Sequence, residues 1–221
     1  CKWKLTDTGV LTISGNGTMD NYGYDNPSPP WEKYKDDMIN TIIIKDGVEN
    51  IGSEAFMNCF ALTNITIPTS VVYIGSEAFM NCTALTNIRI PENVTEICYD
   101  TFENCSALES IIIPDGVTEI HSCAFKDCSS LKSIHIPASV TVIGSSDWFL
   151  YNDAFEGCSA LDSITVDPNN TTFDSRENCN AIIKTSGNIL YVGCNNTVIP
   201  DGITRIASYA FKRCTSLTSI I

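Results

Sequence analysis

Basic residues and histidine are scarce in this sequence. Its 221 residues include 13 lysines and arginines against 26 aspartates and glutamates, a formal net charge of -13. A chain this acidic is repelled by nucleic acid and by anionic membrane surfaces, so we expect no nucleic-acid partner. No apolar run approaches the ~20 residues that a helix needs to cross a bilayer, so we expect no membrane insertion.

The sequence also lacks the motifs of common catalytic sites. Its only histidines are His121 and His135. There is no Gly-x-Ser-x-Gly elbow, no phosphate-binding glycine loop and no pair of carboxylates beside a predicted cleft. We therefore predict that the chain is not an enzyme, and we expect no cofactor.

No charged and then apolar leader precedes the first strand-like segment, so a secretory signal is either absent or already removed. Cys1 could mark a lipidated bacterial N-terminus. Because the strand-like segment from Trp3 to Leu5 follows at once, no flexible tether is left. We therefore favour an arbitrary chain boundary over a lipid anchor.

Repetition is what the sequence has in abundance. The nine residues IGSEAFMNC occur at 51–59 and occur again, unchanged, at 74–82. A reacting site needs different groups that converge on one point, whereas a repeated phrase places identical groups at regular intervals. Ile-x-Ile phrases, most of them followed by proline, recur with the same step. They begin at Ile42, Ile65, Ile88, Ile111 and Ile134, and a displaced copy begins at Ile164.

The repeat predicts a coil whose apolar side chains face inward. A period of about 20 to 29 residues with a Leu-x-x-Ile-x-Ile phrase is typical of a leucine-rich solenoid. Proline has no N–H to donate, so Pro68 should end the strand of its coil. One coil cannot bury its apolar positions alone, so neighbouring coils must stack. We predict a β-rich leucine-rich repeat solenoid with one short parallel strand per 23-residue coil. The inward positions of one coil are Leu62, Ile65, Ile67, Val71, Ile74, Ala78, Phe79 and Cys82.

The chain divides into four parts. Residues 1–40 should form an N-terminal cap with a β-hairpin and a short helix, and 41–161 five leucine-rich repeats, the fifth with a seven-residue insertion. Residues 162–199 should form a variant repeat with a β-hairpin, and 200–221 a truncated last repeat. The last repeat stops in mid-strand, so we expect the natural protein to continue. An open strand there could allow edge-to-edge association of a chain that we otherwise expect to be monomeric.

Aromatic residues gather in the cap. We expect them to shield the open end of the solenoid, which repeat proteins require. Binding of a ring-shaped ligand is the alternative. The residues are Trp3, Tyr22, Tyr24, Trp31 and Tyr34.

Eleven cysteines raise the question of disulfides and metal. Six share one repeat position, and stacked coils ~4.8 Å apart place their Cβ atoms too far apart for a disulfide, so we expect buried free thiols. A bridge between Cys179 and Cys194 across the predicted hairpin is an alternative. A metal site formed by Cys98, His121 and Cys123 is another, although no zinc-binding spacing supports it. The six cysteines are Cys59, Cys82, Cys105, Cys128, Cys158 and Cys214.

The repeat consensus IPxxVxxIGxxAFxxCxxLxxI resembles the BspA-like leucine-rich repeat family. The segments LTISGNGTMDNY and PPWEKY are similar to the cap of many bacterial members, and ENCNAIIKTSGNILYVGCNNTVIPDGI resembles a variant repeat. The resemblance covers nearly the whole chain. It implies a bacterial cell-surface or secreted protein with a role in adhesion, and a partner that differs between members.

Two functions follow from this. The chain is either a binding module for a protein or glycan partner, with host extracellular matrix or another cell surface as candidates, or a structural spacer that presents another domain. Arg89 and His135 are candidate contacts in the outward column of the sheet, which is otherwise small and mostly polar. The inserted residues Trp148, Phe149 and Tyr151 either anchor a partner or fold back over a neighbouring coil. The column reads Ile43, Thr66, Arg89, Ile112, His135 and Thr165.

Overall fold

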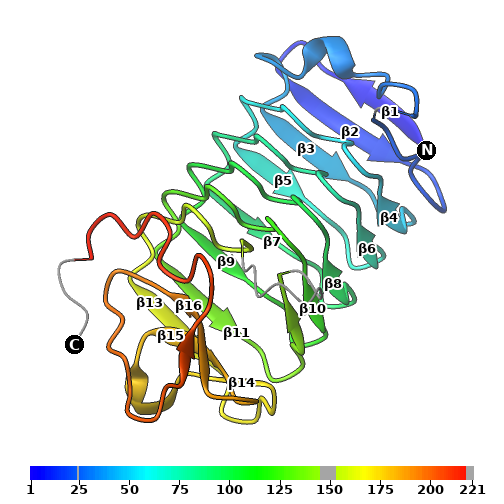
Figure 1. Cartoon of the computed structure of the whole chain (residues 1–221). Coiled ribbons are helices and arrows are strands. Elements are labelled where there is room, and N and C mark those ends of the chain that lie inside the picture. Colours follow the sequence, from blue (N-terminus) through cyan, green and yellow to red (C-terminus); the bar gives the residue numbers. More distant parts are fainter. Residues whose placement is uncertain (24, 145–152, 218–221) are drawn as a thin grey trace.

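The computed structural model describes residues 1–23, 25–144 and 153–217 and shows a stack of coils (Figure 1). One strand of each coil contributes to a parallel array that we call the main ladder. From Thr41 onward, register partners lie one repeat period apart, as in Thr41 and Asn64, until a longer step separates Ser133 from Ser163. The leucine-rich repeat solenoid is thereby confirmed. The main-ladder strands are β2 (Val10–Ser14), β3 (Thr41–Ile44), β5 (Asn64–Thr66), β7 (Asn87–Arg89), β9 (Ser110–Ile112), β11 (Ser133–Ile136) and β13 (Ser163–Val166).

Within the described residues, five coils contain a second strand that the prediction of one strand per coil did not include. These two-residue strands pair in parallel with their neighbours, as Ile51 does with Ile74. The inward isoleucine predicted for the return side of the coil is the second residue of each strand. The strands are β4 (Asn50–Ile51), β6 (Tyr73–Ile74), β8 (Glu96–Ile97), β10 (Glu119–Ile120) and β12 (Val142–Ile143).

The predicted inward positions form the core. In the coil that begins at Leu62, the side chains of Leu62, Val71 and Phe79 are fully buried. Only Ile65 and Ile67 are partly exposed. Burial of these apolar side chains between coils is the main favourable term in the stability of the stack.

The turn between the second strand and the next main-ladder strand explains the recurring asparagine. Residues with positive φ recur there, as at Glu54 (54°) and Asn58 (65°). The backbone N–H of Asn58 donates to the Met80 carbonyl of the next coil at 2.8 Å. Asparagine and aspartate tolerate the left-handed conformation better than other non-glycine residues. The sequence therefore has Asn81, Asn104 and Asp127 at the equivalent sites.

Two columns of identical side chains run through the core. Phe79 and Phe102 stack with ring centroids 5.7 Å apart and planes 3° apart. Beside the rings, cysteine thiols donate to phenylalanine carbonyls of the preceding coil, as Cys105 Sγ does to Phe79 O at 3.2 Å. All the cysteines are free thiols. Burial raises the pKa of Cys105 to about 12. The stacked rings are Phe56, Phe79, Phe102, Phe125 and Phe155.

The cap closes the N-terminal end of the phenylalanine column. β1 (Lys2–Leu5) pairs antiparallel with β2. The loop after β2 leads to a short 3-10 turn, η1 (Glu32–Tyr34). Trp31 is 2% exposed and stacks on Phe56 at 5.7 Å, and its Nε1 donates to Ala55 O at 2.9 Å. Tyr22 packs edge-on against Trp31. Trp31 and Tyr22 therefore shield the solenoid end, and Tyr24 lies outside the described residues.

The C-terminal part departs from the repeat. β14 (Phe173–Asp174), β15 (Ala181–Lys184) and β16 (Ile189–Gly193) are antiparallel neighbours, and β17 (Arg205–Ile206) adds in parallel to β16. The second 3-10 turn, η2 (Arg176–Asn178), precedes β15. The predicted edge strand from Leu217 to Ile221 lies, except for Leu217, outside the described residues.

The alternative of a bridge between Cys179 and Cys194 is not what the structure shows. Lys184 pairs with Ile189, as a register with Cys179 opposite Cys194 requires. Ile182, however, pairs with Val192, because a β-bulge shifts the register by one residue. Cys179 is therefore not opposite Cys194. The two thiols donate separately to Ala181 O and Asn180 O.

Candidate functional site

The outer face of the main ladder brings together a cation and an exposed apolar side chain. β7 and β9 pair so that Arg89 lies directly beside Ile112. The isoleucine is 77% exposed, which is unusual for a residue type that is mostly buried. Arg89 Nη2 lies 3.8 Å from Glu92 Oε1, and both side chains are largely exposed. An ion pair this exposed contributes little, so the guanidinium remains available to a partner.

His135 follows Ile112 by one period and is exposed on β11. Its Nδ1 lies 2.9 Å from the Thr165 hydroxyl oxygen on the neighbouring strand β13. The two candidate contacts from the sequence, Arg89 and His135, thus flank Ile112 in one row. The sequence placed Ile112 in the outward column without a role, although its position between Arg89 and His135 was the available signal.

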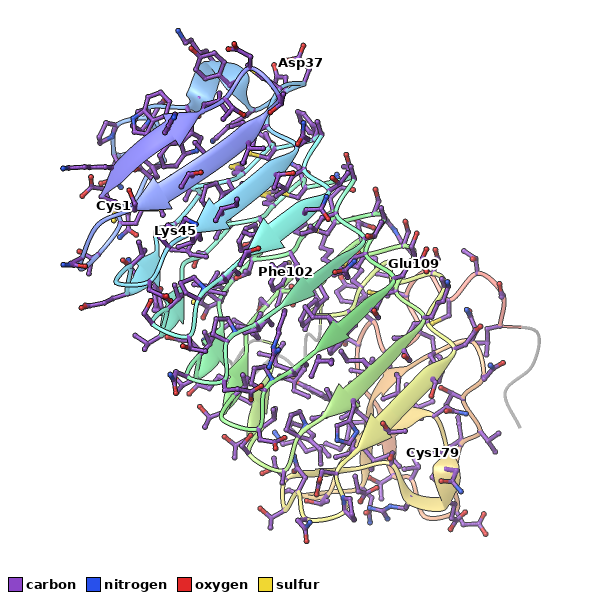
Figure 2. All side chains as sticks on the ribbon, turned by 180° about the vertical axis from the view of Figure 1, so that it is seen from behind. Cys1, Asp37, Lys45, Phe102, Glu109 and Cys179 are labelled. Atoms are coloured by element: carbon purple, nitrogen blue, oxygen red, sulfur yellow. The ribbon has the colours of Figure 1, made fainter. Side chains whose placement is uncertain are left out.

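A groove of about 490 Å³ lies along Arg89 and Ile112 of this row and does not reach His135. Its size is within the range of about 300 to 1,000 Å³ that is usual for ligand sites. Ile112 supplies its exposed apolar side chain, since those of Ile88, Ile90 and Ile111 are buried, and Arg89 and Glu92 supply charges of opposite sign. Figure 2 shows the strands of the main ladder side by side with side chains projecting along the array. The groove is lined by Asn87, Ile88, Arg89, Ile90, Glu92, Ser110, Ile111 and Ile112.

The structure does not bring Cys98, His121 and Cys123 together as a metal site. His121 Nε2 lies 3.0 Å from Glu96 Oε2, and the ring stacks on Tyr99 at 4.6 Å. Cys123 Sγ lies 3.4 Å from Asp153 Oδ2. Across residues 1–23, 25–144 and 153–217, no group of three or more histidine, cysteine or acidic side chains could hold a metal ion.

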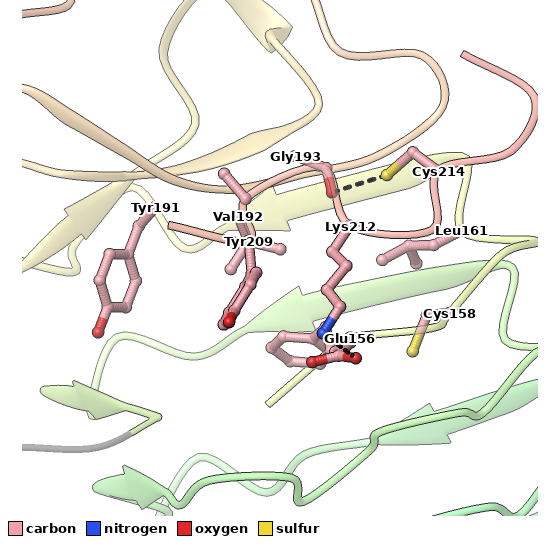
Figure 3. A pocket seen from close by; sticks show the side chains of 11 residues that line it. Glu156, Cys158, Leu161, Tyr191, Val192, Gly193, Tyr209, Lys212 and Cys214 are labelled. Carbon is pink, nitrogen blue, oxygen red and sulfur yellow. Dashed lines mark hydrogen bonds and ion pairs between the residues drawn. The ribbon is translucent and has the colours of Figure 1, made fainter. Parts of the chain in front are cut away.

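The gap between the fifth coil and the last repeat is too small for a ligand. Figure 3 shows Lys212 and Glu156 facing each other across it, with Nζ and Oε1 2.7 Å apart, and Cys214 Sγ directed to Gly193 O. The space measures about 10 Å³, barely the room of one water molecule. The contact therefore joins two coils.

The insertion residues Trp148, Phe149 and Tyr151 lie outside the part of the chain that the structure describes. Their predicted role as a contact therefore stays a prediction. Among the described residues, no helix is long and apolar enough to cross a membrane.

Comparisons with known proteins agree with the coil geometry. A leucine rich cell surface protein from Faecalibacterium prausnitzii is 28% identical, covers 99% of this chain and 67% of its own length, and has a TM-score of 0.65. A leucine-rich repeat protein from Bacteroides ovatus is 26% identical over 100% of this chain, which spans 51% of that protein, with a TM-score of 0.57. The T. pallidum leucine rich repeat protein is 28% identical over 74% of this chain and 78% of its own, with a TM-score of 0.55.

None of the curated proteins compared with the sequence matches it. The sequence profile described as the BspA type leucine rich repeat region matches in six copies at residues 32–152 and 185–221, more than half of the chain. The unmatched segment between them contains β13, β14 and β15. The chain therefore belongs to the BspA-type leucine-rich repeat family.

Proposed function

We propose that the chain is a non-catalytic binding module of a bacterial cell-surface or secreted protein, and that it adheres to a protein partner through the outer face of the main ladder. Its similarity to the F. prausnitzii protein, which is described as a cell surface protein, supports the location. The stacked coils supply a rigid surface, which lowers the entropy cost of binding.

The row of Arg89, Ile112 and His135 is the observation that carries the proposal. Ile112 supplies an apolar anchor, and the nitrogens of the flanking side chains supply hydrogen bonds. Such a row offers a central apolar contact with a polar rim, which is the arrangement of most interface hot spots. The small exposed side chains around it, such as Ser110 and Ser133, allow a partner's backbone to approach.

A matched pair of substitutions tests this surface. Binding to immobilised extracellular-matrix proteins and to whole cells is measured for Ile112→Asp and for Thr66→Asp, two coils away in the same column. We expect Ile112→Asp to weaken binding at least ~10-fold, equivalent to ~1.4 kcal/mol, and Thr66→Asp to have a much smaller effect. Equal losses of binding in both variants would mean that the added negative charge alone weakens binding, and would contradict the role of Ile112 as an anchor.

The structural spacer is the competing function. It predicts that the unaltered chain binds neither matrix proteins nor cells, with or without its insertion.

A loss of binding in Trp148→Ala or Tyr151→Ala at unchanged melting temperature would place a second contact on the insertion. Unchanged binding in both would assign the insertion to packing.

A further inference from the structure

A second pocket lies at the N-terminal end of the molecule, where the cap meets the first coil. It has a volume of about 350 Å³, which suits a small ligand better than a macromolecule. Residues of the cap and of the first coil contribute to it. They are Tyr22, Gly23, Ser28, Pro29, Glu32, Lys35, Glu54, Met57 and Asn58.

A chain of side-chain amides ends in this pocket. Asn104 Nδ2 donates to Asn81 Oδ1 at 2.8 Å, and Asn81 Nδ2 donates to Asn58 Oδ1 at 2.7 Å. Each amide in such a chain polarises the next, so the donor at the end is strengthened. Within the described ranges, the Asn58 NH₂ group has no acceptor, although Asn58 lines the pocket. The pocket therefore presents a polarised hydrogen-bond donor.

The charges in the pocket select against ions. The side chain of Lys35 is 5% exposed, and its Nζ lies 2.8 Å from Glu32 Oε2, which neutralises it. The carboxylate of Glu54 packs directly over Gly23, where an added Cβ would clash with Glu54 Oε1. Among the residues that the structure describes, none donates a hydrogen bond to this carboxylate. An anion would meet the carboxylate of Glu54, and a cation would leave the Asn58 donor without an acceptor.

A neutral ligand that both donates and accepts hydrogen bonds fits these groups. Hydroxyl groups on adjacent carbons can donate to the Glu54 carboxylate and accept from the Asn58 amide. Met57 lines the pocket beside them, and so do Tyr22 and Pro29, which are largely buried, so the apolar surface offered to a C–H face is small. We propose that this pocket binds a neutral saccharide through a pyranose ring with adjacent hydroxyls.

This site is separate from the proposed protein-binding surface on β7, β9 and β11, so either proposal can fail while the other holds. The methyl glycosides of glucose, galactose and N-acetylglucosamine are the probes. Acetate and methylammonium are the charged controls. The readout is the pair of side-chain amide resonances of Asn58 and Asn81 in the ¹⁵N-labelled chain.

We expect at least one glycoside to shift the Asn58 resonances more than those of Asn81, at concentrations where acetate and methylammonium do not. Glu54→Gln should weaken that glycoside at least ~10-fold, because the charged acceptor is lost. The matched control is Glu77→Gln, at the same repeat position one coil later, with the same left-handed backbone. It should bind as the unaltered chain does.

Asn58→Asp gives a second variant, since aspartate occupies the equivalent left-handed site at Asp127. It removes the donor and should also abolish binding. Binding is read from the Asn81 resonances, and the melting temperature checks that the variant is folded. The proposal is overturned if no glycoside shifts Asn58, if Glu54→Gln and Glu77→Gln weaken binding equally, or if a charged probe binds more tightly than every glycoside.

Discussion

The coils from residue 41 to 144 and the part from residue 162 onward hold together by different kinds of contact. In the regular coils a side chain meets its own copy in the next coil, as Phe79 meets Phe102. In the later part the contacts occur once. Tyr191, the bulge residue of β16, donates its hydroxyl to Ile143 O at 3.0 Å, and Arg213 pairs with Asp127.

The two parts differ in how much of their stability depends on a single residue. Repeated contacts make stability a sum of similar nearest-neighbour terms, so one altered copy leaves the others in place. A contact that occurs once has no substitute. The later part should therefore be more sensitive to single polar substitutions, and the regular coils better protected from solvent.

The largest expected contrast is in thiol reactivity. Burial raises the pKa of Cys59 and Cys105 to about 12, whereas the pKa of Cys214, in the partly exposed last repeat, is raised by burial to about 11. The thiolate is the reactive form, so at pH 8 the buried column should contain about one part in ten thousand of it. We expect Cys1 to be alkylated first, Cys214 later, and the fully buried Cys59 and Cys105 only after denaturant is added.

Mass spectrometry of the alkylated peptides without reductant measures this order. Column cysteines already oxidised before labelling would contradict the free-thiol assignment. Labelling of Cys105 as fast as Cys214 would remove the contrast between the two parts.

Two asparagines provide the next contrast. Asn170 is 8% exposed and makes four bonds: Nδ2 donates to Pro137 O (2.8 Å) and Val140 O (2.9 Å), and Oδ1 accepts from the amides of Thr172 (2.9 Å) and Phe173 (2.8 Å). Asn170→Ala leaves these backbone groups without partners and should cost ~3 kcal/mol, or about 6 to 12 °C of melting temperature.

The comparison variant is Asn81→Gly in the regular coils. Its φ of 62° suits glycine, and the site is partly exposed, so water can replace the lost amide bonds. We expect a loss of ~1 kcal/mol or less in urea denaturation. A larger loss than for Asn170→Ala would show that the asparagine column acts cooperatively.

The same division explains what the sequence could predict. The inward positions of the coil from Leu62 to Cys82, the phenylalanine column and the free thiols followed from the regular period, because each copy repeats the same environment. The second strands were missed since two-residue pairings depend on backbone geometry that the consensus does not encode. The register shift in β16 depends on the single residue Tyr191, so no repetition revealed it.

The candidate sites follow the same rule. Arg89 and His135 could be placed on the outward column by counting, and Ile112 with them. The pocket at the cap could not be predicted, because Glu54 and Asn58 are repeat residues that look identical to Glu77 and Asn81. Only their position at the end of the stack, facing Gly23 and Lys35, gives them a different environment.

The smallest expected effect concerns a carboxyl group in the regular coils. Burial, with a hydrogen bond to Glu103, raises the pKa of Asp100 from 3.8 to about 7. The folded chain therefore binds this proton more tightly than the unfolded chain. The contribution of the protonated Asp100 carboxyl group to stability is fully present below about pH 4 and is lost as the pH rises to about 7.

Asp100→Asn should remove this dependence, because an amide mimics the protonated acid and asparagine tolerates the left-handed backbone at φ 55°. The site is partly exposed, so we expect only ~1 kcal/mol, or about 2 to 4 °C, of added stability at pH 8 and almost none at pH 4. The control is Asp115→Asn on an exposed turn, which should show no such difference between the two pH values. Thermal denaturation of both variants beside the unaltered chain measures the effect. An equal gain at both pH values would mean that the added stability comes from the backbone rather than from the titration of Asp100.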